Sequence, residues 1–146
     1  MNVVIEKKPL EKMIAHAEEY YPNECCGFFF GTDGEVRKIS LSRQVTNARE
    51  GDQRRRFQID PEDYRKAEKF AVEQNLDLLG VYHSHPDHPA VPSEHDRRVA
   101  MPYFSYIIIS VKGGKAEETR SWQLNEERQF DEEPFELIET REQQES

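Results

Sequence analysis

The sequence predicts an α/β fold in which helices flank a layered, mixed β-sheet. Helical and strand patterns alternate along the earlier part of the chain. They are followed by two extended runs that the tight turn "KGGK" joins into a hairpin. A length of 146 residues suits one domain with a core of useful size, so helices are expected to pack on a single mixed sheet.

In the earlier part of the chain, three apolar runs predict strands, and the turn "TDGE" joins the second and third. Leu10, Met13 and Ala17 recur at helical spacing between the first two runs. Pro9 suits the first turn of that helix, and Pro22 ends it. The expected strands are residues 2–6, 26–31 and 36–41, and the expected helix covers residues 9–21.

Farther along, Asp60 followed by Pro61 is typical of a helix N-cap and of the first helical position. An apolar strand then runs into a group of histidines, and a short helix follows that Pro102 ends. The expected helices are residues 61–75 and 92–101, and the expected strands are residues 77–85, 105–111 and 116–124.

The last segment of the chain consists mostly of charged and amide side chains. We expect residues 1–124 to form the domain and residues 125–146 to be an acidic tail. This tail is either a loosely docked helix around Phe135 and Ile138 or a disordered segment.

The composition argues against several classes of protein. Hydrophobic residues make up 36% of the chain and charged residues 34%, and the net charge of −9 disfavours a general nucleic-acid binder. No apolar run approaches the roughly 20 residues of a membrane span, and the N-terminal segment lacks the apolar core of a signal peptide. Cys25 and Cys26 are adjacent and are not expected to pair with each other. We therefore expect a cytoplasmic protein, with neither nucleic acid nor a membrane as its partner.

The stretch "GVYHSHPDHPAVPSEHD" concentrates histidines at the end of an apolar strand. His83 and His85 are at alternate positions, so on a strand their imidazoles point to the same face. Two such rings can share one Zn²⁺, but a site needs a third ligand, and Asp96 in the next helix is the candidate. Three protein ligands leave the fourth tetrahedral position for water, which is typical of catalytic zinc.

Other interpretations of this stretch need no metal. The histidines could belong to a polar surface loop, and Ser93 followed by Asp96 resembles a helix capping box. His88 and His95 are expected to be exposed to solvent, although either could replace Asp96 as a ligand.

Hydrolysis at a metal centre needs a carboxylate that acts as a base without saturating the metal. Glu24, at the start of the buried strand, is the candidate. Spacing alone favours another interpretation, a surface glutamate that follows the end of a helix.

Taken together, these residues resemble the motif of the JAMM (MPN-plus) metalloprotease family. In that family a glutamate lies far upstream of His-x-His, and an aspartate follows after ten intervening residues. Here the corresponding residues are Glu24, the segment His83-Ser84-His85-Pro86, and Asp96, with Ser93 preceding the aspartate. The surrounding stretches "PNECCGFFFG", "FQIDPEDY" and "SYIIISV" resemble the small prokaryotic branch, and the likeness covers about residues 1–124.

The resemblance implies a cytidine-deaminase-like fold and a zinc ion held by His83, His85 and Asp96. It further implies that Glu24 is the general acid and base of a metallopeptidase. Ser93 is then expected to hydrogen-bond to the oxyanion that forms on the scissile carbonyl. This role competes with helix capping, unless one hydroxyl serves both.

Family members cleave the bond after the C-terminal Gly-Gly of a ubiquitin-like protein. Bacterial ones resemble enzymes that release amino acids or peptides from sulfur carriers of the ThiS/MoaD type, so we expect such a carrier as partner. Arg54, Arg55 and Arg56 lie where the family has a substrate-clamping insertion. They either attract an acidic carrier or form a solvated charge run. The oligomeric state stays open, with a homodimer as one candidate.

Three other classes of protein are alternatives to a zinc peptidase. A cysteine hydrolase would pair Cys25 or Cys26 with His83, but cysteines that open an apolar strand are usually small buried hydrophobes. A non-catalytic scaffold domain of the same fold typically loses metal ligands, and here all of them are present. A related deaminase needs a Pro-Cys-x-x-Cys zinc signature, which this sequence does not contain.

Overall fold

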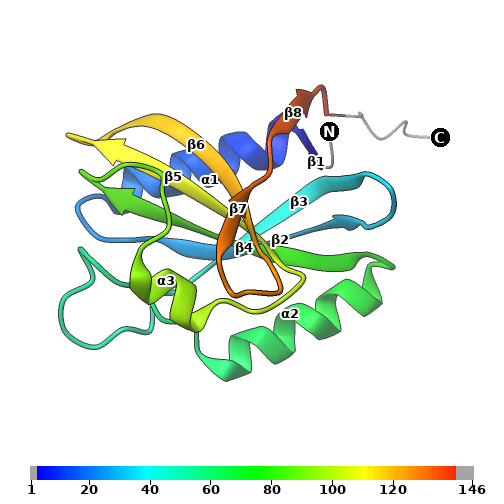
Figure 1. Ribbon diagram of the computed structural model, residues 1–146, viewed down its shortest axis with the longest axis horizontal. Helices are drawn as coiled ribbons and strands as arrows, with labels where there is room; N and C mark the ends of the chain where they lie inside the picture. Colours follow the sequence, from blue (N-terminus) through cyan, green and yellow to red (C-terminus); the bar gives the residue numbers. More distant parts are fainter. Residues whose placement is uncertain (1–2, 141–146) are drawn as a thin grey trace.

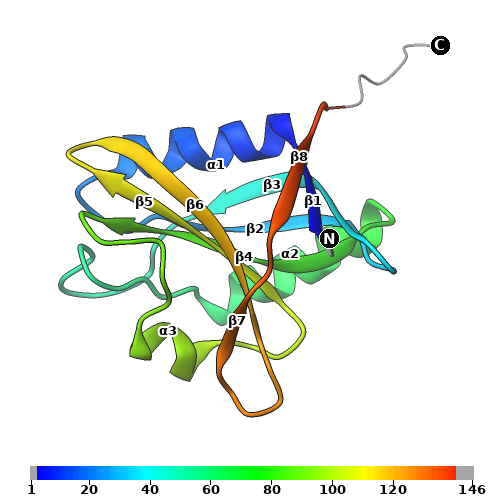
Figure 2. The same ribbon diagram turned by 45° about the horizontal axis from the view of Figure 1, so that its top comes forward.

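In the computed structural model, which describes residues 3–140, helices cover both faces of a curved sheet (Figures 1 and 2). Helix α1 (Lys7–Tyr20) lies on one face and helix α2 (Pro61–Glu73) on the other. This layering confirms the predicted α/β fold class. The remaining elements, in chain order, are β1 (Val3–Glu6), β2 (Cys26–Thr32), β3 (Arg37–Val45), β4 (Asp77–Pro86), α3 (Glu94–Val99), β5 (Ser105–Lys112), β6 (Lys115–Leu124), β7 (Phe130–Glu132) and β8 (Phe135–Ile138).

The sheet has the strand order β7-β6-β5-β4-β2-β3-β1-β8. Strand β4 lies in its middle, parallel to β5 and antiparallel to β2, so the sheet is mixed, as predicted. Cys26 is the partner of His83 in the β2–β4 pair, and Ser110 is the partner of His85 in the β4–β5 pair. Two hydrogen-bonded neighbours therefore fix the strand that carries the histidines.

Strand β2 is apolar and buried up to its last residue, the exposed Thr32, because helices cover both of its faces. Phe29 belongs to the core layer that contains Met13 of α1. Phe28 and Phe30 belong to the layer that contains Ala67 of α2. Because side chains alternate along a strand, three consecutive phenylalanines serve both layers, and each buried ring contributes about 1.5–3 kcal/mol of transfer free energy.

The two long helices begin close to the predicted positions. Asp60 caps α2, because its side chain accepts a hydrogen bond from the Glu62 N–H at 2.8 Å, and Pro61 takes the first helical position. Helix α1 begins at Lys7, slightly before Pro9. Local capping chemistry thus determines where α2 begins, whereas α1 begins without a side-chain cap.

The expectation of a loosely docked helix or disordered tail after residue 124 is wrong for the residues that the structure describes there. Strand β7 pairs antiparallel with β6, and β8 pairs parallel with β1, so this segment forms both edges of the sheet. Phe130 and Phe135 pack against the core layers. Edge strands need few apolar side chains, because one side of the ladder faces water. Residues 141–146 of the expected tail lie outside the described residues.

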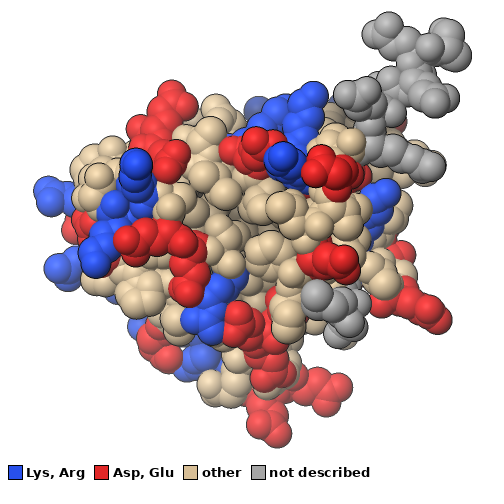
Figure 3. Space-filling view, turned by 90° about the horizontal axis from the view of Figure 1, so that it is seen from above, with Lys and Arg blue, Asp and Glu red and all other residues tan. Residues whose placement is uncertain are grey.

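The surface mixes charges of both signs. On the face seen in Figure 3, acidic and basic side chains are interspersed, so no single sign of charge dominates that face. Among residues 3–140, no helix combines the length and the apolar character needed to cross a membrane.

Candidate metal centre

His83 and His85 lie near the end of β4 and are buried, with exposed fractions of 1% and 7%. Their Nε2 atoms are 3.2 Å apart, as expected for rings on one face of a strand. Phe57 stacks on the His83 ring with a centroid separation of 4.5 Å. Phe57 belongs to the loop that precedes α2, so this stacking lets the loop hold the plane of the imidazole.

Asp96 approaches the histidines from α3, whose first turn is held by a capping box. The Asp96 N–H donates to Ser93 Oγ at 3.0 Å, and the Ser93 N–H donates to Asp96 Oδ2 at 2.9 Å. The capping interpretation is therefore confirmed. It does not exclude a metal site, because the cap itself directs the Asp96 carboxylate toward His83 and His85.

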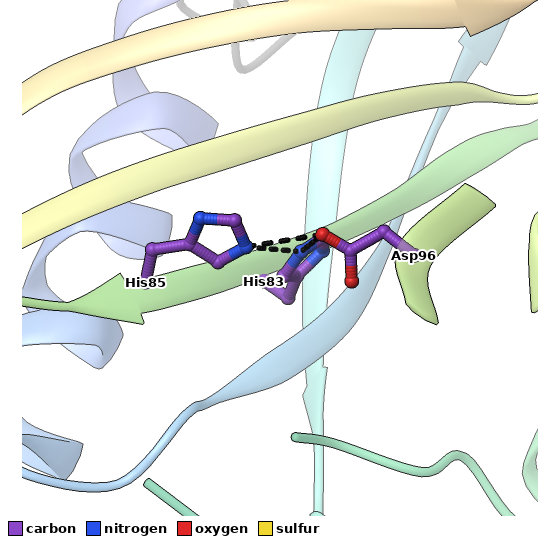
Figure 4. A group of neighbouring side chains, drawn as sticks. All are labelled: His83, His85 and Asp96. Atoms are coloured by element: carbon purple, nitrogen blue, oxygen red, sulfur yellow. Dashed lines mark hydrogen bonds and ion pairs between the residues drawn. The ribbon is translucent and has the colours of Figure 1, made fainter. Parts of the chain in front are cut away.

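Figure 4 shows the three side chains pointing toward one another. Asp96 Oδ2 lies 3.1 Å from His85 Nε2 and 3.3 Å from His83 Nε2, and one possible ligand atom from each residue lies within 4.8 Å of the others. Burial alone would raise the pKa of the Asp96 carboxyl, but attraction and hydrogen bonds from the two imidazoles hold that pKa well below its usual range. Burial lowers the pKa of His83, which favours its neutral form.

This donor set fits a divalent metal ion. Two ring nitrogens 3.2 Å apart need a proton or a cation between them, and the anionic Asp96 carboxylate faces the same point. His85 Nδ1–H donates to the Pro89 carbonyl oxygen at 2.8 Å, which leaves the lone pair of His85 Nε2 facing the cluster. Within residues 3–140, His83 Nδ1 makes no hydrogen bond. The described residues thus form a candidate centre with three ligands.

Glu24 lies beside this centre, two residues before β2 begins, and its exposed fraction is 3%. The interpretation as a surface glutamate is therefore wrong. Hydrogen bonds at 2.8 Å from Cys25 N–H to Ser84 Oγ, and at 3.2 Å from Ser84 N–H to the Cys25 carbonyl, hold the chain next to the histidines. Burial, followed by the negative charges of Asp96 and Asp52, raises the pKa of Glu24 to about 9. This carboxyl group can therefore hold a proton at neutral pH.

The backbone of Glu24 is also tied to the loop between β3 and α2. The Glu24 N–H donates to the Gln53 carbonyl at 2.7 Å. The side-chain amide of the buried Asn47 donates to the carbonyls of Glu24 and Arg56 at 3.0 and 3.2 Å. The general-base candidate and the arginine-rich loop thus form one hydrogen-bonded unit.

A cleft of about 690 Å³ lies beside the centre. It brings together Glu24, His85 and Ser93, three residues that the resemblance assigns to the chemistry, although they come from different elements. Its walls are formed by Glu24, Arg55, His85, His88, Pro89, Val91 and Ser93.

The remaining predicted residues fall at different places around the cleft. His88 is exposed, as expected, and lines the cleft, whereas His95 is half-buried and lines a neighbouring cavity. Arg54, Arg55 and Arg56 are all exposed, and of these three Arg55 lines the cleft.

The two cysteines are free, which confirms that they do not pair with each other, and both are buried. Burial raises the pKa of the Cys25 thiol to about 12 and raises that of Cys26 further. Neither thiol is activated as a nucleophile, because nucleophilic cysteines need a lowered pKa. The geometry therefore disfavours the cysteine-hydrolase alternative.

Four contributors to the site were not anticipated from the sequence. In the sequence, Ser84 is simply the residue between the two histidines. Strand alternation places its side chain on the opposite face of β4, and this is the one sequence feature that could have indicated its role. Asn47 and Phe57 lie in a polar loop with no periodicity, and Pro89 contributes a backbone carbonyl, which no sequence pattern indicates.

The fold and the three converging ligands define a class of protein, small α/β domains of the JAB1/MPN type with a candidate metal centre. A JAB1/MPN domain protein from Archaeoglobus fulgidus superposes with a TM-score of 0.59 at 16% identity, over 94% of this chain and 98% of that chain, which shows the fold alone. The chain belongs to the Prok-JAB family, the prokaryotic homologs of the JAB domain, whose model matches residues 6–125. This confirms the family that the motif predicted.

Similarity to individual proteins extends over most of the chain. The Desampylase of Pyrococcus furiosus is 32% identical over 110 residues, which are 75% of this chain and 72% of that protein. The CysO-cysteine peptidase of Mycobacterium tuberculosis is 27% identical over 123 residues, covering 84% and 82% of the two chains. A solution structure from Desulfitobacterium hafniense is 34% identical, with a TM-score of 0.82 over 94% of this chain and 93% of that one.

Proposed function

We propose that this protein is a zinc-dependent hydrolase that cleaves the peptide or isopeptide bond after the C-terminal Gly-Gly of a ubiquitin-like sulfur carrier. The observation that carries the proposal is the convergence of His83, His85 and Asp96 beside a buried Glu24. The names of the relatives, a desampylase and a peptidase of a CysO-cysteine adduct, support cleavage of a carrier conjugate. A scaffold domain would not need this arrangement.

His83, His85 and Asp96 would hold the zinc, because two imidazole nitrogens and a carboxylate oxygen are a usual ligand set for Zn²⁺. Bound there, zinc would supply an activated water near neutral pH and polarise the scissile carbonyl. The Pro89 carbonyl orients one ligand and the capping box orients another. The chain's own contacts thus organise the ligands.

Glu24 would move the proton. A divalent cation bound by His83, His85 and Asp96 would favour the ionised form of Glu24. Its carboxylate would then take a proton from the attacking water and return it to the leaving nitrogen as the carbon–nitrogen bond breaks. A buried position suits this double role, because the raised pKa lets the side chain hold the proton between the two steps. The products are the carrier with a free glycine carboxylate and a free amine.

Ser93 can serve the cap and the reaction together. Its oxygen accepts the Asp96 N–H, which leaves the hydroxyl hydrogen free to donate into the cleft that Ser93 lines. A carbonyl oxygen that becomes negative there would receive this hydrogen bond. Glycine at the scissile position suits a narrow approach to the metal, since it brings no Cβ.

The exposed Arg54, Arg55 and Arg56 would attract an acidic carrier to the side of the cleft where Arg55 lies. A cytoplasmic location and a homodimer remain predictions. Both are compatible with a soluble carrier protein as the substrate.

The two roles of Ser93 make different predictions for its variants. If Ser93 donates to the oxyanion, Ser93→Ala lowers kcat by about 10²–10³-fold and leaves KM little changed. Ser93→Asp, which keeps a helix cap, is then worse than alanine because it places a negative charge beside a developing negative charge. Steady-state kinetics measure both variants, and zinc content is checked in parallel.

A purely capping role gives another pattern. Ser93→Ala then costs about 0.5–2 kcal/mol of stability, turnover of the folded fraction stays constant, and Ser93→Asp restores the melting temperature. An active Ser93→Asp enzyme would defeat the oxyanion assignment.

The proposed function is tested on the sulfur carriers of the protein's own genome. Each carrier that ends in Gly-Gly is extended by one residue or linked to a lysine side chain, and is then incubated with the zinc-loaded protein. Intact-mass measurement is expected to show a carrier that ends at Gly-Gly, and a chelator is expected to stop the reaction. No shortening of any conjugate by the zinc-loaded protein would refute the proposal.

A further inference from the structure

Arg55 places a permanent positive charge in the wall of the reaction cleft. The walls of this cleft also contain Glu24, His85 and Ser93, the residues proposed for proton transfer, zinc binding and hydrogen bonding to the oxyanion, respectively. Arg54 and Arg56 are exposed like Arg55 but are not among these wall residues. Within residues 3–140, no carboxylate forms an ion pair with Arg55. Its guanidinium group is therefore available to a ligand in the cleft.

The connections of the loop place Arg55 on a particular side of the substrate. Glu24 donates its backbone N–H to Gln53, and Asn47 bridges the carbonyls of Glu24 and Arg56. Arg55 lies between Gln53 and Arg56, both of which these hydrogen bonds link to Glu24, so its backbone is held on the same side of the cleft as Glu24. Because Glu24 delivers its proton to the leaving nitrogen, the neighbourhood of Glu24 is where the leaving group departs.

Two kinds of leaving group differ in charge at this place. An amino acid attached through its α-nitrogen carries a carboxylate one carbon away from the scissile nitrogen. A lysine side chain in an isopeptide bond, or the first residue of a longer peptide, has no free carboxylate there. A guanidinium group binds a carboxylate through two parallel hydrogen bonds, and this geometry distinguishes the first kind from the others.

We propose, on the basis of the proposed function, that Arg55 binds the α-carboxylate of the leaving group, and that the preferred substrate is a carrier bearing one amino acid on its C-terminal glycine. Water supplies the hydroxyl group to the glycine carbonyl, the carbon–nitrogen bond breaks, and Glu24 returns the proton to the amino acid's nitrogen. Arg55 takes no part in these bond changes. It is a specificity-determining residue that selects the leaving group.

The test uses the carrier that the mass assay shows to be cleaved, extended by one alanine in two forms. One form ends in a free carboxylate and the other in a carboxamide, so that they differ only in the charge beside the scissile bond. We expect the wild-type protein to prefer the carboxylate by about 10- to 100-fold in kcat/KM, the range for a hydrogen-bonded charged group. Arg55→Ala is expected to remove this preference by raising KM for the carboxylate form, with kcat unchanged, because the contact exists before and during the reaction.

Three further measurements sharpen the result. Arg55→Lys keeps the charge but not the paired hydrogen bonds, so an intermediate preference is expected. Arg54→Ala is the matched control and is expected to keep the wild-type ratio between the two substrates. Thermal melts are expected to be unchanged in all three variants, because both arginines are exposed.

Failure of this inference can be separated from failure of the proposed function. Equal cleavage of both forms by the wild-type protein, or an equal loss on both forms in Arg55→Ala, would overturn the role of Arg55 while the hydrolase activity stands. Cleavage of neither form, nor of any carrier conjugate, by the zinc-loaded wild-type protein would overturn the proposed function and this inference with it.

Discussion

Replacing Glu24 by glutamine is expected to lower turnover of a carrier conjugate by about 10²–10⁴-fold, the usual contribution of a general acid or base. Glutamine keeps the shape of the side chain but cannot take the proton from the attacking water. The buried position of Glu24 beside His83, His85 and Asp96 makes this the largest kinetic effect expected from an isosteric change. Single-turnover kinetics on the zinc-loaded variant measure it directly.

A change in zinc content or fold would produce a similar loss for another reason, so both are measured on the same sample. Glu24→Gln is expected to bind one zinc per chain and to melt no lower than the wild-type protein, because a neutral amide removes a buried carboxyl group that is costly to ionise. Glu68→Gln on the exposed surface of α2 is the matched control, with wild-type turnover expected. A Glu24→Gln enzyme with near wild-type turnover would move the base elsewhere.

Replacing His83 by alanine is expected to remove stoichiometric zinc and, with it, activity. Mutation of a residue that only orients a metal ligand typically lowers metal affinity by about 10- to 100-fold. Removal of a ligand itself is therefore expected to lower zinc affinity by more than about 100-fold. Elemental analysis after purification without added metal gives the zinc content per chain. Full zinc retention in a folded His83→Ala protein would contradict the ligand assignment.

Two further variants keep this prediction decisive. His83 is fully buried beneath Phe57, so alanine at this position also removes packing. Asp96→Asn preserves the size of the side chain and an acceptor for the Ser93 N–H, yet it removes the charge that faces both imidazoles, and it too is expected to lose zinc. His88→Ala removes the more exposed of the two histidines, His88 and His95, that were alternative ligands, and it is expected to keep one zinc per chain.

Local sequence patterns were sufficient to predict the structure wherever a short stretch determines its own conformation. The Asp60–Pro61 pair predicted the start of α2, and the alternate positions of His83 and His85 placed both rings on one face. The capping box likewise fixed where Asp96 lies on α3. In each case the deciding interactions connect residues that are neighbours in the sequence.

The position of Glu24 could not be obtained in this way. Its burial depends on hydrogen bonds between Cys25 and Ser84, which are 59 positions apart, and on the pairing of β2 with β4. Spacing favoured a surface residue, and the resemblance to a family motif was needed to select Glu24. The stacking of Phe57 on His83 could not be predicted locally either, because it depends on how a loop without periodicity packs over the sheet.

The C-terminal strands show a different limit. The segment around β7 and β8 is so polar that its composition favoured a tail, yet backbone pairing with β6 and β1 places both strands at the sheet edges. Hydrophobic patterns report burial of side chains, whereas an edge strand is held largely by its backbone. Within the described part of this segment, Phe130 and Phe135 are apolar side chains that pack against the core layers.

The central claim, that one zinc ion held by His83, His85 and Asp96 drives hydrolysis of a carrier conjugate, is tested most directly by metal titration. Protein stripped by a chelator and then dialysed is supplied with zinc in steps, and the rate of carrier cleavage is measured by intact mass at each step. The rate is expected to rise in proportion to bound zinc and to level off at one ion per chain. Cleavage at the full rate by the stripped protein would contradict the claim.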